Sequence, residues 1–272
     1  MHYQKRFYQI FLLALLVLSI NFEANAETSK KDTPIYLKLG RYYILYTYPD
    51  SPFIDNNRLM VSVKSVQDLM GGEVKYDNTS KEVTINWLKH EFKLKSNSYN
   101  VTVDGKSTIL DLKPVVKQNM LFIPVYILLN NSDIQWCWNS NYNLLEITDQ
   151  RAINGIPFVD FKSNEWGADI LNENAFHLIS YSLKLGEPRE TLSILARNIS
   201  KHDVPYGKVD IQPLVSYLNK GRVGGYSADS YIRRVYPLLP LVKKDGTVLK
   251  TITVEFENKN VGYIICVGRE LK

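Results

Sequence analysis

The chain has 272 residues, of which 45% are hydrophobic and 22% are charged, so it can bury the core of a globular protein. Its 33 Lys and Arg against 28 Asp and Glu give a formal net charge of +5, and the basic residues alternate with acidic ones. Nucleic-acid-binding proteins carry a basic patch or stripe, so this composition argues against a nucleic-acid partner.

Residues 1–26 have the order of a secretory signal peptide. Lys5 and Arg6 form a positive start, residues 10–20 are almost all apolar, and Ala24-Asn25-Ala26 places small residues at a cleavage site. The apolar run is shorter than the roughly 20 residues that cross a bilayer, which favours cleavage over an uncleaved anchor. We expect an extracellular or cell-envelope protein with no transmembrane segment after cleavage.

A duplication organises the first half of the chain. Residues 52–85 align with residues 114–147 without a gap, and each copy predicts a strand, a turn, a strand, a short helix and a hairpin. In this alignment the apolar residues Met60, Val61 and Val63 fall on Phe122, Ile123 and Val125. Tyr76 falls on Trp138, and we expect these two rings to seal the two cores; a Trp138 side chain mostly in solvent would favour Trp136 as the equivalent of Tyr76.

The first copy carries the pattern Pro-x-Ile-x-[Asn/Asp]-Asn-Arg-x-Met-Val-x-Val, then Met-Gly-Gly-x-Val-x-Tyr-Asp, then Ser-x-x-Val-Thr-Ile. Residues 34–150 thereby resemble the copper amine oxidase N-terminal-like family, also called stalk domains. The second copy keeps only the proline, the apolar strand and the aromatic-Asn pair. The resemblance implies small α+β units that serve as spacers or adhesion modules in secreted and surface proteins of Gram-positive, spore-forming bacteria.

The family name does not imply copper chemistry here. In the amine oxidases the stalk is remote from the copper and the quinone cofactor. Residues 34–150 hold only His90, whereas copper(II) favours several imidazoles. We therefore expect no cofactor and no metal site in this protein.

Residues 151–272 predict a different domain, for which no family resemblance is evident. After a linker or first strand at 151–164, apolar spacing predicts three helices, which begin near Glu165, Pro188 and Asp210. Three strands then predict a meander, with Asp245-Gly246 as one hairpin turn. The expected fold class is α+β: two tandem antiparallel-sheet-plus-helix units, then a helical-hairpin and three-stranded-meander domain.

Catalytic candidates are few, because the chain has no GxSxG, HExxH, Walker or GxGxxG motif. His202 and Asp203 lie in a predicted loop, where functional residues concentrate, and Glu165 opens a predicted helix. These three are the candidates for acid–base chemistry. A Cys266 thiol activated by His177 or His202 is conceivable, although Cys266 lies in an apolar strand pattern that favours a core residue.

The two cysteines, Cys137 and Cys266, leave two alternatives open. In an oxidising compartment they can form a disulfide, which would staple the two predicted domains together. Two separate buried thiols explain them equally well. No CxxC or other metal-type spacing occurs.

These features favour a non-enzymatic module in which stalk-like repeats present residues 151–272 to a cell-wall polymer or another envelope protein. The alternative is a small extracellular hydrolase with its site in residues 151–272. Convergence in one pocket of any two polar candidates would favour the hydrolase; the set is His177, His202, Glu165, Asp169 and Asp203.

Overall fold

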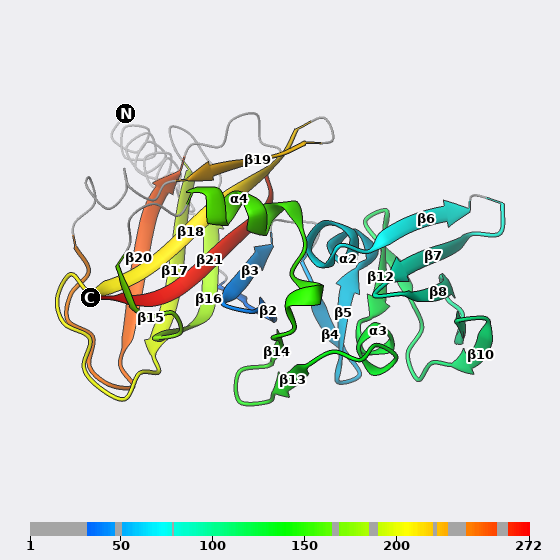
Figure 1. The fold of residues 1–272 in the computed structure, drawn as a ribbon, viewed down its shortest axis with the longest axis horizontal. Coiled ribbons are helices and arrows are strands. Elements are labelled where there is room, and N and C mark those ends of the chain that lie inside the picture. Colours follow the sequence, from blue (N-terminus) through cyan, green and yellow to red (C-terminus); the bar gives the residue numbers. More distant parts are fainter. Residues whose placement is uncertain are drawn as a thin grey trace, which may run out of the picture. The chain divides into compact units, whose positions relative to one another are not determined.

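The computed structural model describes residues 32–46, 51–77, 79–164, 169–184, 190–219, 222–227, 238–254 and 261–272. Strands dominate these ranges, and the described α-helices are three short ones, α2, α3 and α4 (Figure 1). None of them is long and apolar enough to cross a membrane. The expected α+β class is therefore wrong: the described chain is mostly β. The predicted signal peptide lies outside the described residues.

The predicted duplication appears element by element. The first copy contains β4 (Phe53–Asp55), β5 (Arg58–Ser62), α2 (Val63–Met70), β6 (Glu73–Asp77) and β7 (Glu82–Trp87). The second contains β11 (Val115–Lys117), β12 (Met120–Pro124), α3 (Tyr126–Asn130), β13 (Trp136–Asn139) and β14 (Leu144–Ile147). Corresponding elements follow in the same order, so the gapless alignment is confirmed.

Local signals explain why both copies fold alike. Asn56-Asn57 and Gln118-Asn119 both have positive φ at the two turn positions, as tight hairpin turns between antiparallel strands require. The Ser62 hydroxyl accepts the backbone N–H of Ser65 and caps α2, which ends at Gly71 with a φ of 70°.

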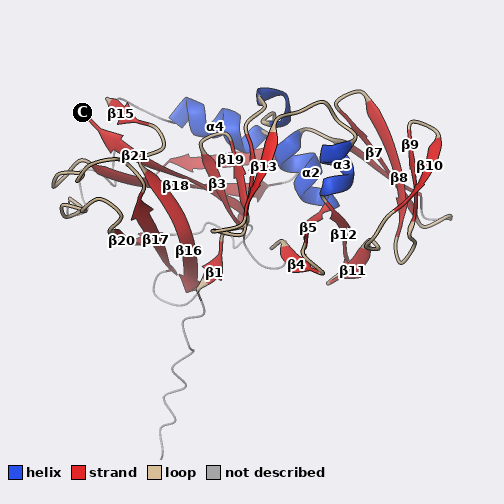
Figure 2. Cartoon of the chain, turned by 90° about the horizontal axis from the view of Figure 1, so that it is seen from below, coloured by secondary structure: helices blue, strands red, loops and turns tan. Residues whose placement is uncertain are grey.

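The two copies meet along their central strands. β5 pairs antiparallel with β12, so that Val61 lies opposite Ile123, and the order β11-β12-β5-β4 forms a four-stranded sheet. Figure 2 shows α2 and α3 on one side of this sheet. Val61 and Ile123, which the alignment equates, are buried in one core.

The expected aromatic seal is wrong, although the register is right. Tyr76 is 54% exposed and Trp138 is 39% exposed. Their cross-strand partners, Val83 and Leu145, are the buried residues of each hairpin. Both aromatic residues lie on outer strands of their sheets, beyond which the described ranges contain no further strand.

The first copy extends into a five-stranded antiparallel sheet of order β10-β9-β8-β7-β6. It adds β8 (His90–Lys95), β9 (Asn100–Val103) and β10 (Lys106–Ile109). Alternation along these strands buries Ile85, Phe92 and Val101 against the repeat core and leaves polar residues outside.

The three helices predicted in the second half are wrong where the structure describes them. The segments form strands instead: β15 (Ile170–Asn172), β16 (Phe176–Lys184), β17 (Glu190–Asn198) and β18 (Val209–Asn219). In β17 the deeply buried residues Leu192, Ile194 and Ala196 recur at period two, as in a strand with one buried face. A helix, α4, occupies Ile156–Asn164, where a linker or strand was expected.

The predicted meander is also wrong, because its strands belong to different sheets. One sheet has the order β1-β16-β17-β20, with β1 at Thr33–Pro34 and β20 at Thr247–Val254. The other has the order β13-β14-β2-β3-β21-β18-β19 and adds β2 (Leu37–Leu39), β3 (Tyr42–Tyr46), β19 (Arg222–Ser227) and β21 (Val261–Leu271). A turn does form at Asp245-Gly246, where the Gly246 N–H bonds the Lys243 carbonyl and Asp245 has a φ of 60°. It is not a hairpin turn, because Val242 before it bridges Val204 whereas β20 after it pairs with β17. Residues 231–237 lie outside the described ranges.

The larger sheet joins strands from both sides of the boundary predicted at residue 150. β3 pairs with β21, with Ile44 opposite Ile265, and β2 runs parallel to β14. Successive β3 residues face opposite cores: Ile44 faces the core of the repeats, and Leu45 faces the core beneath β16 and β17. This sheet positions the turn between β2 and β3 and the outer strand β13.

Candidate functional site

The two described loop candidates, His202 and Asp203, point to different partners. His202 Nε2 lies 2.9 and 3.0 Å from the two carboxylate oxygens of Glu270. The Glu270 side chain is only 3% exposed, whereas the imidazole is 54% exposed. The Asp203 carboxylate instead accepts the backbone N–H of Lys244 at 2.7 Å. Glu165 lies outside the described residues.

His177 is a buried ring in an aromatic cluster. Its ring stacks on Tyr142 with centroids 3.7 Å apart, and Nδ1 lies 3.3 Å from the Tyr43 hydroxyl. Burial lowers the pKa of His177 to about 4, with the charge of Glu146 acting in the opposite direction. The imidazole is therefore neutral near pH 7. Burial also raises the pKa of Tyr43, so its hydroxyl stays protonated.

Asp169 and Glu173, which the sequence places on one face of a predicted helix, have separate partners. Asp169 pairs with Lys272 at 2.8 Å, and Glu173 pairs with Arg41 at 2.8 Å. Each described member of the candidate set thus contacts its own neighbour, and none lines either of the two pockets of the described chain.

The arrangement that most resembles an acid–base pair is His202 with Glu270. The sequence did not predict it, because β21 brings Glu270 to the loop from the far end of the chain.

The structure answers the cysteine question against a bridge. Both thiols are free, Cys137 exposed and Cys266 buried. The two cysteines stand at the ends of one cross-strand row that runs through Glu146, Lys38 and Tyr43. Four strand spacings separate them by about 19 Å, whereas a disulfide needs Cα atoms within about 7 Å. Burial raises the pKa of the Cys266 thiol, which keeps it protonated.

A metal site in the repeat segment would have to include His90, its one histidine. His90 Nδ1 lies 2.7 Å from Asp104. Within the described ranges, no three His, Cys, Asp or Glu side chains gather in a possible metal site.

A pair of exposed tryptophans marks the edge of the larger sheet. Trp136 and Trp138 are 37% and 39% exposed and lie on one face of β13, the outer strand beside β14. Their cross-strand partners, Ile147 and Leu145, are buried. The apolar face of the sheet therefore continues outward and ends in two indole rings, whose Cα atoms stand about 7 Å apart along the strand.

The sequence did not predict a surface position for either tryptophan. Their spacing, two residues apart on a short strand, places both on one face whichever face is buried. The missing information is that β13 is an outer strand, which depends on the order of strands in the folded sheet.

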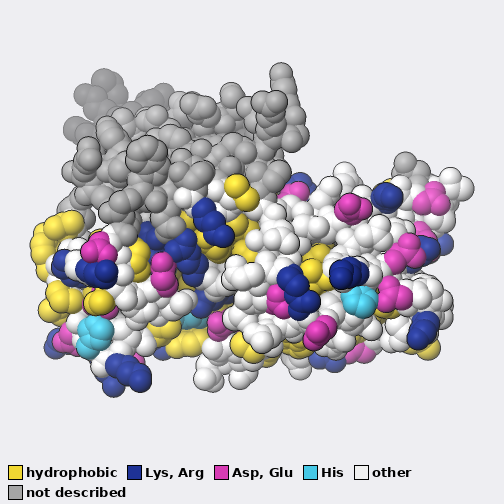
Figure 3. Space-filling view, in the orientation of Figure 1, with side chains coloured by type: hydrophobic (Ala, Val, Ile, Leu, Met, Phe, Trp, Pro, Cys, Tyr) yellow, Lys and Arg dark blue, Asp and Glu magenta, His cyan; other side chains and the backbone are white. Residues whose placement is uncertain are grey.

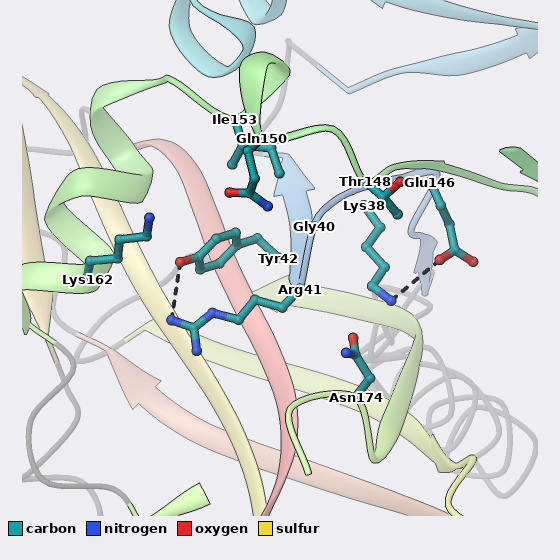
Figure 4. Close-up of a pocket in the computed structure, with 10 residues that line it drawn as sticks. All are labelled: Lys38, Gly40, Arg41, Tyr42, Glu146, Thr148, Gln150, Ile153, Lys162 and Asn174. Atoms are coloured by element: carbon teal, nitrogen blue, oxygen red, sulfur yellow. Dashed lines mark hydrogen bonds and ion pairs between the residues drawn. The ribbon is translucent and has the colours of Figure 1, made fainter. Parts of the chain in front are cut away.

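A polar pocket of about 440 Å³ lies beside the turn between β2 and β3. We call it the turn pocket. Figure 4 shows Gln150 on one side of it, with Arg41, Lys38 and Asn174 around the other sides and Lys162 reaching in from α4. The Cβ of any residue other than glycine at position 40 would lie 2.9 Å from Ile153, and Gly40 has a φ of 59°. Glycine therefore suits this turn, because it adopts the positive φ and lets the backbone lie against Ile153.

Two ion pairs hold cationic side chains at the turn pocket. Lys38 Nζ lies 3.5 Å from Glu146 Oε2, across the β2–β14 pair. Arg41 donates to Glu173 Oε1 at 2.8 Å and to the Tyr42 hydroxyl at 3.2 Å. Tyr42 is fixed in turn by Phe158 and Phe161 of α4, with ring centroids 4.9 and 5.2 Å away. The pocket wall is therefore braced by a sheet, a helix and two ion pairs.

A second pocket of about 420 Å³ lies between α3 and the β9–β10 hairpin. Its wall includes Tyr126, whose hydroxyl bonds Asp111. Arg58 also pairs with Asp111, so this carboxylate ties β5 to the segment before β11. Tyr126 of the pocket wall is thus part of a contact that holds the repeat together.

Comparison with known proteins bears on the repeat segment alone. No curated protein and no solved structure matches the chain. One family model matches, that of the copper amine oxidase N-terminal domain, and residues 148–272 lie outside the match. The order of elements in both copies and the resemblance of the first copy agree with this finding, and residues 44–147 of the chain match the copper amine oxidase N-terminal domain family.

Proposed function

We propose that this protein is an exported, non-catalytic module that binds a saccharide polymer of the cell envelope. Residues 44–147 form the stalk-like part, and residues 151–272 complete the sheet whose outer strand carries the two tryptophans. The match to the copper amine oxidase N-terminal domain family is consistent with a non-catalytic, stalk-like module. Export rests on the signal-like sequence of residues 1–26.

The observation that carries the binding role is the exposed pair Trp136 and Trp138. The C–H face of a pyranose ring packs on the face of an indole, while its hydroxyl groups remain in water. Tryptophan suits such a surface because it offers a large apolar area with one polar N–H. Two rings about 7 Å apart on one strand face give a linear polymer two successive contacts.

The edge position of β13 also suits an extended ligand. Beyond β13 the sheet has no further strand in the described chain, so a polymer can lie along the edge without displacing a neighbour. Side chains of both signs are interspersed on the face shown in Figure 3. A mixed surface of this kind is compatible with a ligand held by stacking on the tryptophans.

Co-sedimentation with insoluble cell-wall saccharide tests the proposal. The protein without residues 1–26 is mixed with purified wall polymer, and the bound fraction is measured for the parent protein, Trp136→Ala and Trp138→Ala. We expect each substitution to weaken retention at least tenfold, because each removes one stacking surface. Tyr206→Ala is the matched control, since Tyr206 is 64% exposed elsewhere on the surface.

Two outcomes would contradict the proposal. Retention equal to that of the parent in both tryptophan variants would remove β13 from the binding site. Recovery of the protein from the cytoplasm alone, after fractionation of cells that express it, would contradict export.

A further inference from the structure

We infer that the turn pocket binds one acidic sugar unit, a pyranose that carries a single carboxylate. This inference rests on the proposed function, because it names the part of the polymer that enters a defined site. The pocket is walled by side chains from β2, the β2–β3 turn, the segment after β14, and α4. Its volume of about 440 Å³ has room for a sugar ring.

The charges at the turn pocket leave one cation over. Lys38 and Arg41 are matched by Glu146 and Glu173 through the ion pairs described above. Lys162, at the last turn of α4, lines the same pocket and has no ion pair with a described residue. The lining of the pocket thus holds three cationic side chains, Lys38, Arg41 and Lys162, and one carboxylate, Glu146, which favours a ligand with a negative charge.

The uncharged groups of the pocket favour hydroxyl groups on the ligand. Gln150 and Asn174 are amides, each with two N–H donors and one acceptor oxygen, and Thr148 adds a hydroxyl. Sugar hydroxyls both donate and accept hydrogen bonds, so they can satisfy such a mixed wall. An inorganic anion without an O–H group, such as sulfate, offers acceptors alone and would leave the amide oxygens unused.

Isothermal titration with two matched sugars tests the inference. N-acetylmuramic acid and N-acetylglucosamine differ by one carboxylate-bearing ether, so their affinity ratio measures recognition of that charge. We expect the parent protein to bind the acidic sugar at least tenfold more tightly. Lys162→Gln should bring the ratio close to one, and Lys162→Arg should restore it. Lys95→Gln is the control, because Lys95 is an exposed residue of β8 away from this pocket.

Glucuronic acid and inorganic phosphate complete the test. Tight binding of glucuronic acid would place the carboxylate in another acidic polysaccharide and support the inference for that source. Equal affinity for the two matched sugars, an unchanged ratio in Lys162→Gln, or tighter binding of phosphate than of either acidic sugar would overturn it. If wall retention depends on Trp136 and Trp138 while no acidic sugar binds, the inference fails and the proposed function stands. If acidic sugars bind but wall polymer is not retained, the proposed function fails instead.

Discussion

His177 and His202, both in the second half, have different environments. His177 is enclosed by Tyr43 and Tyr142, and its imidazole is neutral near pH 7. His202 stands at the surface and covers the buried carboxylate of Glu270. The sequence cannot distinguish these environments, because Tyr43 and Glu270 come from opposite ends of the chain. Each histidine nevertheless makes a definite prediction about stability.

Removing the His202 imidazole should destabilise the protein through Glu270. In His202→Ala the buried Glu270 carboxylate loses the ring that contacts both of its oxygens. We expect the free energy of unfolding, measured by urea denaturation at pH 7, to fall by about 1–3 kcal/mol. His90→Ala is the control, because its partner Asp104 is half exposed, and an exposed pair contributes less than a buried one, so it should cost clearly less than His202→Ala. Equal effects in the two variants would contradict this account of Glu270.

His177 should make stability depend on pH below neutrality. Its pKa is about 4 in the folded protein against 6.5 for a free imidazole, so between these values the unfolded chain binds a proton that the folded protein does not. The free energy of unfolding therefore keeps its full value above pH 6.5. It falls by on the order of 3 kcal/mol as the pH is lowered from 6.5 towards 4, because the unfolded chain takes up the proton first. Urea midpoints at pH 7 and pH 4.5 should therefore differ less in His177→Phe than in the parent. An identical pH dependence in the two proteins would show that His177 does not titrate in this way.

At the level of elements, the repeat was predictable because its signals are local. The tight turns at Asn56-Asn57 and Gln118-Asn119, and the cap at Ser62, lie next to the strands and helix that they define. The second half was mispredicted because Pro188 and Pro213 imitate helix starts and Gly186 imitates a helix end. Its strands are long and pair with distant partners, and these pairings override the chance helical spacing of leucines.

The close approach of two elements from different halves gives an element-scale prediction. A Cβ at Gly155 would lie 2.2 Å from the backbone oxygen of Asp68 and 2.7 Å from the Cα of Leu69, both in α2. The Gly155 N–H also bonds the Leu69 carbonyl. We expect Gly155→Ala to lower the free energy of unfolding by about 3 kcal/mol, because the overlap with helix backbone cannot relax locally.

Gly105→Ala provides the comparison for this measurement. Gly105 has a φ of 78° but no atom within 4 Å of an added Cβ, so alanine there meets only the backbone cost of about 1–2 kcal/mol. Chemical denaturation of both variants separates steric overlap from backbone strain. A Gly155→Ala protein as stable as the Gly105→Ala protein would show that α2 and the start of α4 are not packed as described.

For the whole molecule, the two halves share one sheet. The sequence indicated a boundary near residue 150, yet Cys266 lies opposite Tyr43 and Leu145 lies opposite Leu37. Such pairings between remote segments leave no periodic trace in either segment, so no local pattern could predict them. The candidate site was unpredictable for the same reason. Trp136 and Trp138 are present in the sequence, but their position on the outer strand of a sheet depends on pairings between distant segments.

A fragment that ends at residue 150 tests this shared sheet. Without β21, strand β3 would keep β2 but lose its other partner, and the apolar residues Ile44 and Leu45 would lose the cover that the second half provides. We expect residues 27–150 alone to aggregate or to unfold without a cooperative transition, measured by circular dichroism during heating. A soluble fragment with a sharp transition would establish residues 34–150 as an independent domain.

The most direct test of the central claim is the tryptophan emission of the protein during titration with soluble wall polysaccharide. Of the four tryptophans, Trp87 is only 2% exposed, whereas Trp136 and Trp138 face solvent. If sugar rings stack on β13, the emission shifts to shorter wavelength and saturates, and the shift disappears in the double variant Trp136→Phe and Trp138→Phe. Saturable binding of the polysaccharide with no change in emission, or the same change in the double variant, would contradict the account.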